Sequence, residues 1–226
     1  MNIKKPNKFI ELIANTLHIY SAKTYKDGSK VFCNYIKKEY YKNGQLLLEV
    51  PYTKGKEHGI KKGYYENGKL KYECSYTKGI KQGIAKWYYI GGQLQFEIPY
   101  IKDIKHGIYK EYYRSGQLNY EIPYKNGEKH GIWKEYYETG ELNCEWPFVL
   151  GKEHGIYKEY YQSGQLKNEL PFKKGIKHGI VKWYYISGKL EYEIPYKNGK
   201  KHGIQKEYYK NGKLKKESRY VRGKLI

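Results

Sequence analysis

The chain has 226 residues, 39% of them hydrophobic and 17% aromatic, and its formal net charge is +21. Because 30 of the aromatic residues are Tyr, the side chains cannot assemble a conventional closed core of Leu, Ile and Val. No stretch approaches the roughly 20 apolar residues of a membrane-spanning helix.

Residues 1–33 precede the regular part of the chain, and we expect an N-terminal cap with a degenerate half repeat. A short helix or strand is expected over residues 8–20, followed by a turn at Tyr25-Lys26-Asp27-Gly28. Glu11, Asn15 and His18 interrupt the only early apolar run, which argues against a signal peptide. Cys33, Cys74 and Cys144 share no repeat position, and this favours a reducing, cytoplasmic location over a disulfide framework.

Residues 34–226 repeat one block, HGIxKxYYxxGxLxxExPY, at an interval of 24 residues. We number the first residue of each block as position 0. The eight blocks begin at Asn34, His58, Gln82, His106, His130, His154, His178 and His202. Self-similarity at a fixed short period predicts an array in which each unit buries its apolar face against its neighbours. An extended binding surface is therefore expected, not a pocket.

Each block is predicted to form a β-hairpin. Ile at position 2 and Tyr at positions 6 and 7 favour strands, and Gly at position 10 marks a turn, as in Asn43-Gly44. A second Gly at position 21 marks the turn into the next block, with Asp103 as the exception. The fold class expected is all-β, an elongated single-layer antiparallel sheet of consecutive hairpins.

The register follows if the first turn is a two- or four-residue loop, because paired positions then sum to 19. Lys at position 4 then faces Glu at position 15 in all eight copies, from Lys38–Glu49 to Lys206–Glu217. Side chains alternate between faces along a strand. One face should collect positions 3, 5, 7, 12, 14 and 16, with all four Trp residues, while the other holds the Lys–Glu pairs.

The string YxxGxxHGIxKxYYxxGxL, as in Tyr124 to Leu142, resembles the MORN repeat, specifically a bacterial variant class associated with the antitoxin component of toxin–antitoxin systems. The resemblance covers residues 34–226. It implies a sheet of consecutive hairpins, a role in scaffolding and protein–protein contact, and in some members contact with acidic phospholipids. The antitoxin association implies a cognate toxin as partner.

Six histidines share position 0, which raises a metal-site hypothesis. Equivalent residues of successive hairpins should lie roughly 9–10 Å apart, whereas Zn²⁺ ligands must nearly touch. We therefore expect turn residues bonded to the backbone, and no metal or cofactor. Eight equivalent Lys–Glu pairs supply no unique acid–base site, so an enzyme with a small-molecule substrate is not expected.

The second turns, at residues 53–57 and every 24 residues onward to 221–225, carry 17 Lys or Arg against 4 Asp or Glu. Candidate anion-binding residues there are Lys173, Lys174, Lys177, Lys197, Lys200 and Lys201. This edge is either a solvated rim or a contact for an anionic phospholipid surface or another polyanion. Nucleic acid is disfavoured, because only Arg114, Arg219 and Arg222 offer the guanidinium forks that phosphate recognition favours.

The aromatic side chains of the Trp-bearing face either pack against one another across neighbouring repeats or form a groove for a protein partner. We favour the groove because aromatic residues are enriched at the centres of interfaces. The function expected is a non-catalytic scaffold that binds a protein, either a toxin or another copy of this chain. Peripheral attachment to a polyanion through the basic edge is the alternative. The expected contact residues are Trp87, Tyr109, Tyr120, Trp133, Trp146, Tyr157, Trp183 and Tyr192.

Overall fold

A computed structural model of the chain describes residues 7–13, 16–24 and 30–226, with side chains from residue 34 onward. Every regular element in these ranges is a β-strand, and the strands pair antiparallel. The all-β prediction is confirmed. Contacts divide the chain into unit 1, residues 1–106, and unit 2, residues 107–226. The two units are described separately below.

Over residues 8–20 the sequence predicted either a short helix or a strand, and the structure has two strands there. The turn expected at residues 25–28 lies outside the described residues. The cap was expected to end at residue 33, but strand β3 continues across that boundary. A separate N-terminal cap therefore stays a prediction. The strands of unit 1 are β1 (Asn7–Ile13), β2 (Thr16–Thr24), β3 (Lys30–Tyr40), β4 (Leu46–Thr53), β5 (Lys56–Glu57), β6 (Gly59–Tyr64), β7 (Leu70–Thr77), β8 (Ile80–Lys81), β9 (Gly83–Tyr88), β10 (Leu94–Ile101) and β11 (Ile104–Lys105).

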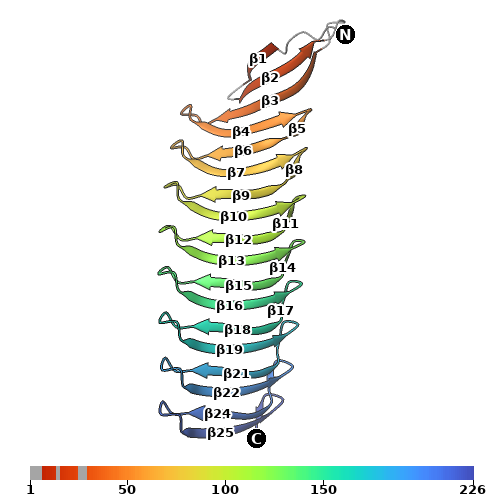
Figure 1. Cartoon of the computed structure of the whole chain (residues 1–226). Coiled ribbons are helices and arrows are strands. Elements are labelled where there is room, and N and C mark those ends of the chain that lie inside the picture. The colour runs from red at the N-terminus through yellow and green to blue at the C-terminus, as the bar shows by residue number, and fades with distance from the viewer. Residues whose placement is uncertain (1–6, 14–15, 25–29) are drawn as a thin grey trace. The chain divides into compact units, whose positions relative to one another are not determined.

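Unit 2 repeats the same pattern of a six-residue strand, an eight-residue strand and a two-residue strand. Its strands are β12 (Gly107–Tyr112), β13 (Leu118–Lys125), β14 (Glu128–Lys129), β15 (Gly131–Tyr136), β16 (Leu142–Val149), β17 (Lys152–Glu153), β18 (Gly155–Tyr160), β19 (Leu166–Lys173), β20 (Ile176–Lys177), β21 (Gly179–Tyr184), β22 (Leu190–Lys197), β23 (Lys200–Lys201), β24 (Gly203–Tyr208), β25 (Leu214–Val221) and β26 (Lys224–Leu225). Within each unit the strands form one layer, with the first turns along one edge and the second turns along the other (Figure 1). A single-layer antiparallel sheet of consecutive hairpins is thus confirmed within each unit.

The first turn differs from the expected two- or four-residue loop. In the first block, Tyr41 N–H donates to the Gln45 carbonyl at 2.8 Å and Gly44 N–H donates to the Tyr41 carbonyl at 3.0 Å. Gly44 has φ 84, so this is a three-residue loop whose last residue is left-handed. Tyr40 then pairs with Leu46 but Glu39 pairs with Leu48, which leaves Leu47 unpaired as a β-bulge.

The bulge recurs at position 13 of every repeat and corrects one face assignment. Between the bulge and the first turn the paired positions sum to 18, so Leu at position 12 pairs with Tyr at position 6, as in Leu118 and Tyr112. Cross-strand partners share a face. The prediction that Leu at position 12 lies on the Trp-bearing face is therefore wrong, because one extra residue reverses the alternation.

Beyond the bulge the expected register is confirmed in all eight repeats, with Lys at position 4 opposite Glu at position 15. In unit 2, for example, Lys134 is the partner of Glu145, and Glu145 is also the partner of Lys158 in the next repeat. Only four of the eight pairs make an ion pair within 4.0 Å: Lys38–Glu49 (3.9 Å), Lys86–Glu97 (3.4 Å), Lys110–Glu121 (3.6 Å) and Lys206–Glu217 (3.9 Å). Within each unit, the paired Lys and Glu residues form a row across the strands, which we call the ladder.

The second turn is a two-residue loop in which both residues have positive φ. At Asn126-Gly127 the φ values are 52 and 87, and Lys125 pairs with Glu128 across the turn. This geometry follows the right-handed twist of the strands and favours Asn-Gly. Leu150, with φ 49, holds the same position in the next repeat.

The core lies on one face of the sheet. Its buried apolar residues all occupy positions 3, 14, 16 or 18: Val50, Cys74, Ala85, Ile98, Cys144, Phe148 and Val181. The opposite, ladder-bearing face leaves the Ile at position 2 about half exposed, between 48% and 51%, at Ile60, Ile84, Ile108, Ile132, Ile156, Ile180 and Ile204. We call the first the aromatic face and the second the ladder face.

Candidate functional site

The aromatic face of unit 2 is built around two indoles. Trp133 on β15 and Trp146 on β16 are cross-strand partners, with ring centroids 5.6 Å apart and ring planes inclined by 11°. The register places them side by side because positions 3 and 16 sum to 19. Stacked pairs of this kind contribute about 0.5–1.5 kcal/mol beyond their buried area.

Further rings extend this pair into a continuous cluster. Tyr120 meets Trp133 edge-on at 5.9 Å, and Tyr157 meets Trp146 edge-on at 4.9 Å. Phe148 packs against both indoles, at 6.2 Å and 6.0 Å, and is only 7% exposed. Four of the eight expected contact residues are thus brought together.

The other four expected contact residues make different contacts. Trp87 belongs to unit 1 and stacks with Tyr72 at 6.1 Å and Phe96 at 4.9 Å. Trp183 and Tyr192 are cross-strand partners on β21 and β22, and Tyr109 on β12 donates its hydroxyl to Glu111 at 2.7 Å. All eight expected contact residues are partly exposed, so mutual packing covers much of each ring and leaves the remainder open.

A row of mostly polar residues, which was not predicted from the sequence, crosses the strands of the aromatic face at positions 5 and 14. Cross-strand pairing orders it as Glu111, Tyr120, Glu135, Cys144, Glu159, Asn168 and Trp183. The recurrence of Glu at position 5 in several repeats was the sequence signal that could have predicted this row.

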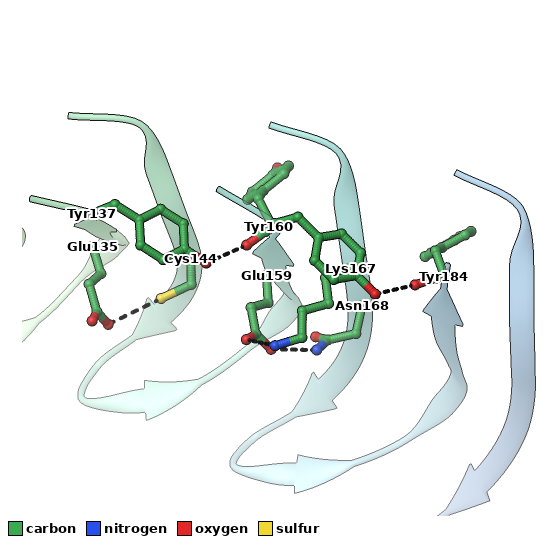
Figure 2. Close-up of polar contacts among 9 residues, drawn as sticks. Glu135, Tyr137, Cys144, Glu159, Tyr160, Lys167, Asn168 and Tyr184 are labelled. Atoms are coloured by element: carbon green, nitrogen blue, oxygen red, sulfur yellow. Dashed lines mark hydrogen bonds and ion pairs between the residues drawn. The ribbon is translucent and has the colours of Figure 1, made fainter. Parts of the chain in front are cut away.

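Local contacts within this row are polar and close (Figure 2). The Cys144 thiol lies 3.6 Å from Glu135 Oε2, while Glu159 accepts from Lys167 at 2.7 Å and from Asn168 at 2.5 Å. Burial raises the pKa of the Cys144 thiol to about 12, and the negative charge of Glu135 adds to the rise. The thiol is therefore protonated at neutral pH and acts as a donor, not as a nucleophile.

Several buried polar atoms of unit 2 lack a hydrogen-bond partner among the described residues. They are Asn119 Oδ1, His130 Nδ1, Trp133 Nε1, Trp146 Nε1 and Asn168 Oδ1. Most lie on the aromatic face, and an unsatisfied buried polar group costs about 1–3 kcal/mol.

Lysine side chains from the second turns reach over this face. Lys129 Nζ lies 4.3 Å from the centroid of the Trp133 ring and 5.0 Å from that of Phe148. Lys177 and Lys201, two of the expected anion-binding residues, likewise lie over Tyr196 and Tyr220, at 5.7 Å and 4.9 Å. These ammonium groups interact with the ring faces.

The remaining expected anion-binding residues are exposed at the second turns: Lys173, Lys174, Lys197 and Lys200. A shallow pocket beside the last two is lined by Lys197, Asn198, Lys200, His202 and Arg222. The second-turn edge of unit 2 thus presents exposed ammonium groups along successive repeats.

Two of the histidines at position 0 accept hydrogen bonds from the backbone of the following turn. His58 Nδ1 accepts from Lys78 N–H and His202 Nδ1 accepts from Arg222 N–H, each at 3.4 Å. Gln82 accepts from Lys102 N–H in the same way at 3.2 Å. This interpretation of position 0 is confirmed at these three repeats.

In the described part of the chain, no group of three His, Cys, Asp or Glu side chains is placed to hold a metal ion. No described segment forms a helix able to cross a bilayer.

Comparison with known proteins agrees with the repeat architecture. No curated protein matches the chain. The model of the family described as MORN repeat variant matches eight consecutive segments, residues 36–54, 57–78, 81–102, 105–126, 129–149, 153–174, 177–198 and 201–222, which together exceed half of the chain. With its eight hairpins at a constant 24-residue interval, the chain belongs to the MORN repeat variant family.

Proposed function

We propose that the protein is a non-catalytic scaffold that binds a protein partner through the aromatic face of unit 2. The observation that carries the proposal is the Trp133–Trp146 stack with Tyr120 and Tyr157 at its flanks. Partly exposed aromatic rings that are already packed lose little side-chain entropy on binding, which is why such residues concentrate binding energy.

Two features of the sheet support a binding role over a purely structural one. A single layer cannot cover both of its faces, and the rings of the cluster keep part of their surface open. A repeated surface without a unique acid–base arrangement favours binding over catalysis. The partner is a protein, either a toxin or a second copy of this chain.

The experiment is an affinity pull-down from the native cell with the partner identified by mass spectrometry. Trp133→Ser combined with Trp183→Ser should reduce recovery of the specific partner at least about tenfold. Ile132→Ser combined with Ile180→Ser changes the neighbouring exposed residues of the ladder face and is the matched control. Circular dichroism must show an intact sheet in both variants. If both variants recovered as much of the partner as the unmodified protein does, the proposal would be wrong.

A second candidate function is attachment to an anionic membrane through the second-turn edge. The exposed Lys173, Lys174, Lys197 and Lys200 favour it, because each Lys near an anionic surface contributes about 1 kcal/mol. Co-sedimentation with phosphatidylcholine vesicles, with and without phosphatidylserine and across a salt series, tests it. Binding that ignores lipid charge would leave these residues as a solvated rim.

A further inference from the structure

Glutamate occupies position 5 of the aromatic face in five repeats, and the repeats differ in how they neutralise it. Glu39 pairs with Lys37 at 2.7 Å, Glu159 with Lys167 at 2.7 Å, and Glu207 with Lys215 at 2.6 Å. Glu111 and Glu135 make no ion pair with any residue in the described part of the chain. Two neighbouring repeats thus hold carboxylates on a half-buried aromatic surface without a cation.

Glu39 takes its cation from Lys37 at position 3, but in the repeats of Glu159 and Glu207 the cation is the bulged residue at position 13. Its side chain turns toward position 5, as Lys167 does toward Glu159 (Figure 2), and Lys215 reaches Glu207 in the same way. In the repeats of Glu111 and Glu135 this position holds Asn119 and Asn143. An amide cannot neutralise a carboxylate, and Asn119 Oδ1 is itself buried without a hydrogen-bond partner.

The two unneutralised carboxylates flank one ring. Tyr120 on β13 is the cross-strand partner of Glu111 on β12 and of Glu135 on β15. Two strand spacings separate the carboxylates by roughly 9–10 Å, so a cation above the ring lies about 5 Å from each. Burial raises the pKa of the Tyr120 hydroxyl, and the charges of Glu135 and Glu111 raise it further, which indicates that both carboxylates act on the ring.

The same face already binds ammonium groups of its own chain. Lys129 lies over the Trp133 ring beside Tyr120, and Lys177 lies over Tyr196. Carboxylates roughly 9–10 Å apart cannot share a metal ion, whose oxygen ligands lie within about 2.6 Å of it. An aromatic floor between two carboxylates favours an organic cation instead.

We propose that Glu111, Tyr120 and Glu135 bind a Lys or Arg side chain presented by an extended segment of the protein partner. The inference rests on the proposed function and names the chemistry of the partner at that surface. The bound side chain takes the place that Lys167 and Lys215 occupy in their own repeats, with Trp133 as the adjoining apolar contact.

A phage-displayed library of random 12-residue peptides tests the proposal even while the natural partner is unidentified. Peptides recovered on the unmodified protein should contain Lys and Arg at least about twofold above library composition. General electrostatics on a protein of net charge +21 favours acidic peptides. An enrichment of basic residues therefore reports local carboxylates.

Two variants should abolish this enrichment by opposite routes. Glu111→Gln with Glu135→Gln removes the carboxylates, while Asn119→Lys with Asn143→Lys supplies the intramolecular ammonium found in the repeats of Glu159 and Glu207. Glu128→Gln with Glu138→Gln makes the same change in net charge at exposed turn positions and should retain the enrichment. A single recovered peptide should bind the first variant at least about tenfold more weakly, as expected for the loss of a charged hydrogen bond.

The outcomes separate this inference from the proposed function. Recovery of specific peptides without Lys or Arg enrichment, or an unchanged enrichment with Glu111→Gln and Glu135→Gln, overturns the cation site and leaves the binding face standing. Recovery that is the same on the unmodified protein and on a folded Trp133→Ser and Trp146→Ser variant overturns both.

Discussion

The Tyr137 hydroxyl donates a hydrogen bond to the backbone carbonyl of Tyr160, one repeat further on, at 2.9 Å (Figure 2). The same bond recurs from Tyr41, Tyr65, Tyr113, Tyr161 and Tyr185, at 2.6–2.8 Å. Position 7 lies next to the first turn, where β-strand pairing between repeats has ended. The tyrosine therefore ties each turn to the next repeat.

Tyr137→Phe should destabilise unit 2 by about 0.5–1.5 kcal/mol, because the phenyl ring remains and only the hydrogen bond is lost. Urea unfolding followed by circular dichroism measures the change. Tyr209→Phe, at the equivalent position of the last complete repeat, where the tyrosine is 50% exposed, is the control and should change stability little. Equal effects of the two substitutions would contradict the structural role of the bond.

The tyrosines at position 6 predict a loss of stability at high pH. Tyr160 donates to Glu145 at 3.2 Å, and burial together with the charge of Glu145 raises the pKa of Tyr160 to about 12. The same pKa is reached by Tyr88, Tyr136 and Tyr184. The folded pKa exceeds the unfolded value of about 10, so this contribution is complete below about pH 10 and is lost as pH rises toward about 12.

Urea unfolding at a series of pH values from about 8 to about 12 tests this prediction, since the free energy of unfolding should fall across the upper part of the range. Tyr160→Phe has no proton to lose there, and its profile should decline less steeply. A profile identical to that of the unmodified protein would show that the hydroxyl does not titrate with folding.

Leu150 predicts a stabilising substitution. It is 65% exposed with φ 49, a conformation that costs L residues about 1–2 kcal/mol but that Asn adopts readily. Leu150→Asn should therefore raise the free energy of unfolding by about 0.5–1 kcal/mol. Asn126→Leu, at the same position of the preceding repeat, should lower it by a similar amount. Changes of the same sign in both variants would contradict the backbone argument.

Gly63 predicts a packing conflict in unit 1. A Cβ atom there would lie 2.2 Å from Cε1 of the Tyr72 ring, which covers the position. Gly63→Ala should destabilise the protein by about 1–3 kcal/mol, as overpacking typically does. Thermal unfolding of the double variant with Tyr72→Ala completes a mutant cycle. The alanine should cost much less once the ring is absent, and additive effects would exclude the clash.

The sequence by itself determined the repeat boundaries, the hairpins and the opposition of Lys and Glu. Only a register in which paired positions sum to 19 brings Lys at position 4 opposite Glu at position 15 in all eight repeats. It also predicted that Trp133 and Trp146 share a face, because side chains alternate strictly on each side of the bulge. These properties depend only on the order of the residues and on the alternation of side chains between the two faces of a strand.

Only the tertiary structure decided where that alternation breaks and what each polar group meets. The unpaired residue at position 13 reverses the face of the Leu at position 12 and turns Lys167 toward Glu159, and no residue type marks it, since Leu, Lys, Asn, Gln and Glu all occupy it. The lysines that lie over rings and the carboxylates that lack a cation follow from distances between neighbouring repeats. A one-dimensional pattern does not contain those distances, because they depend on how the twisted strands pack.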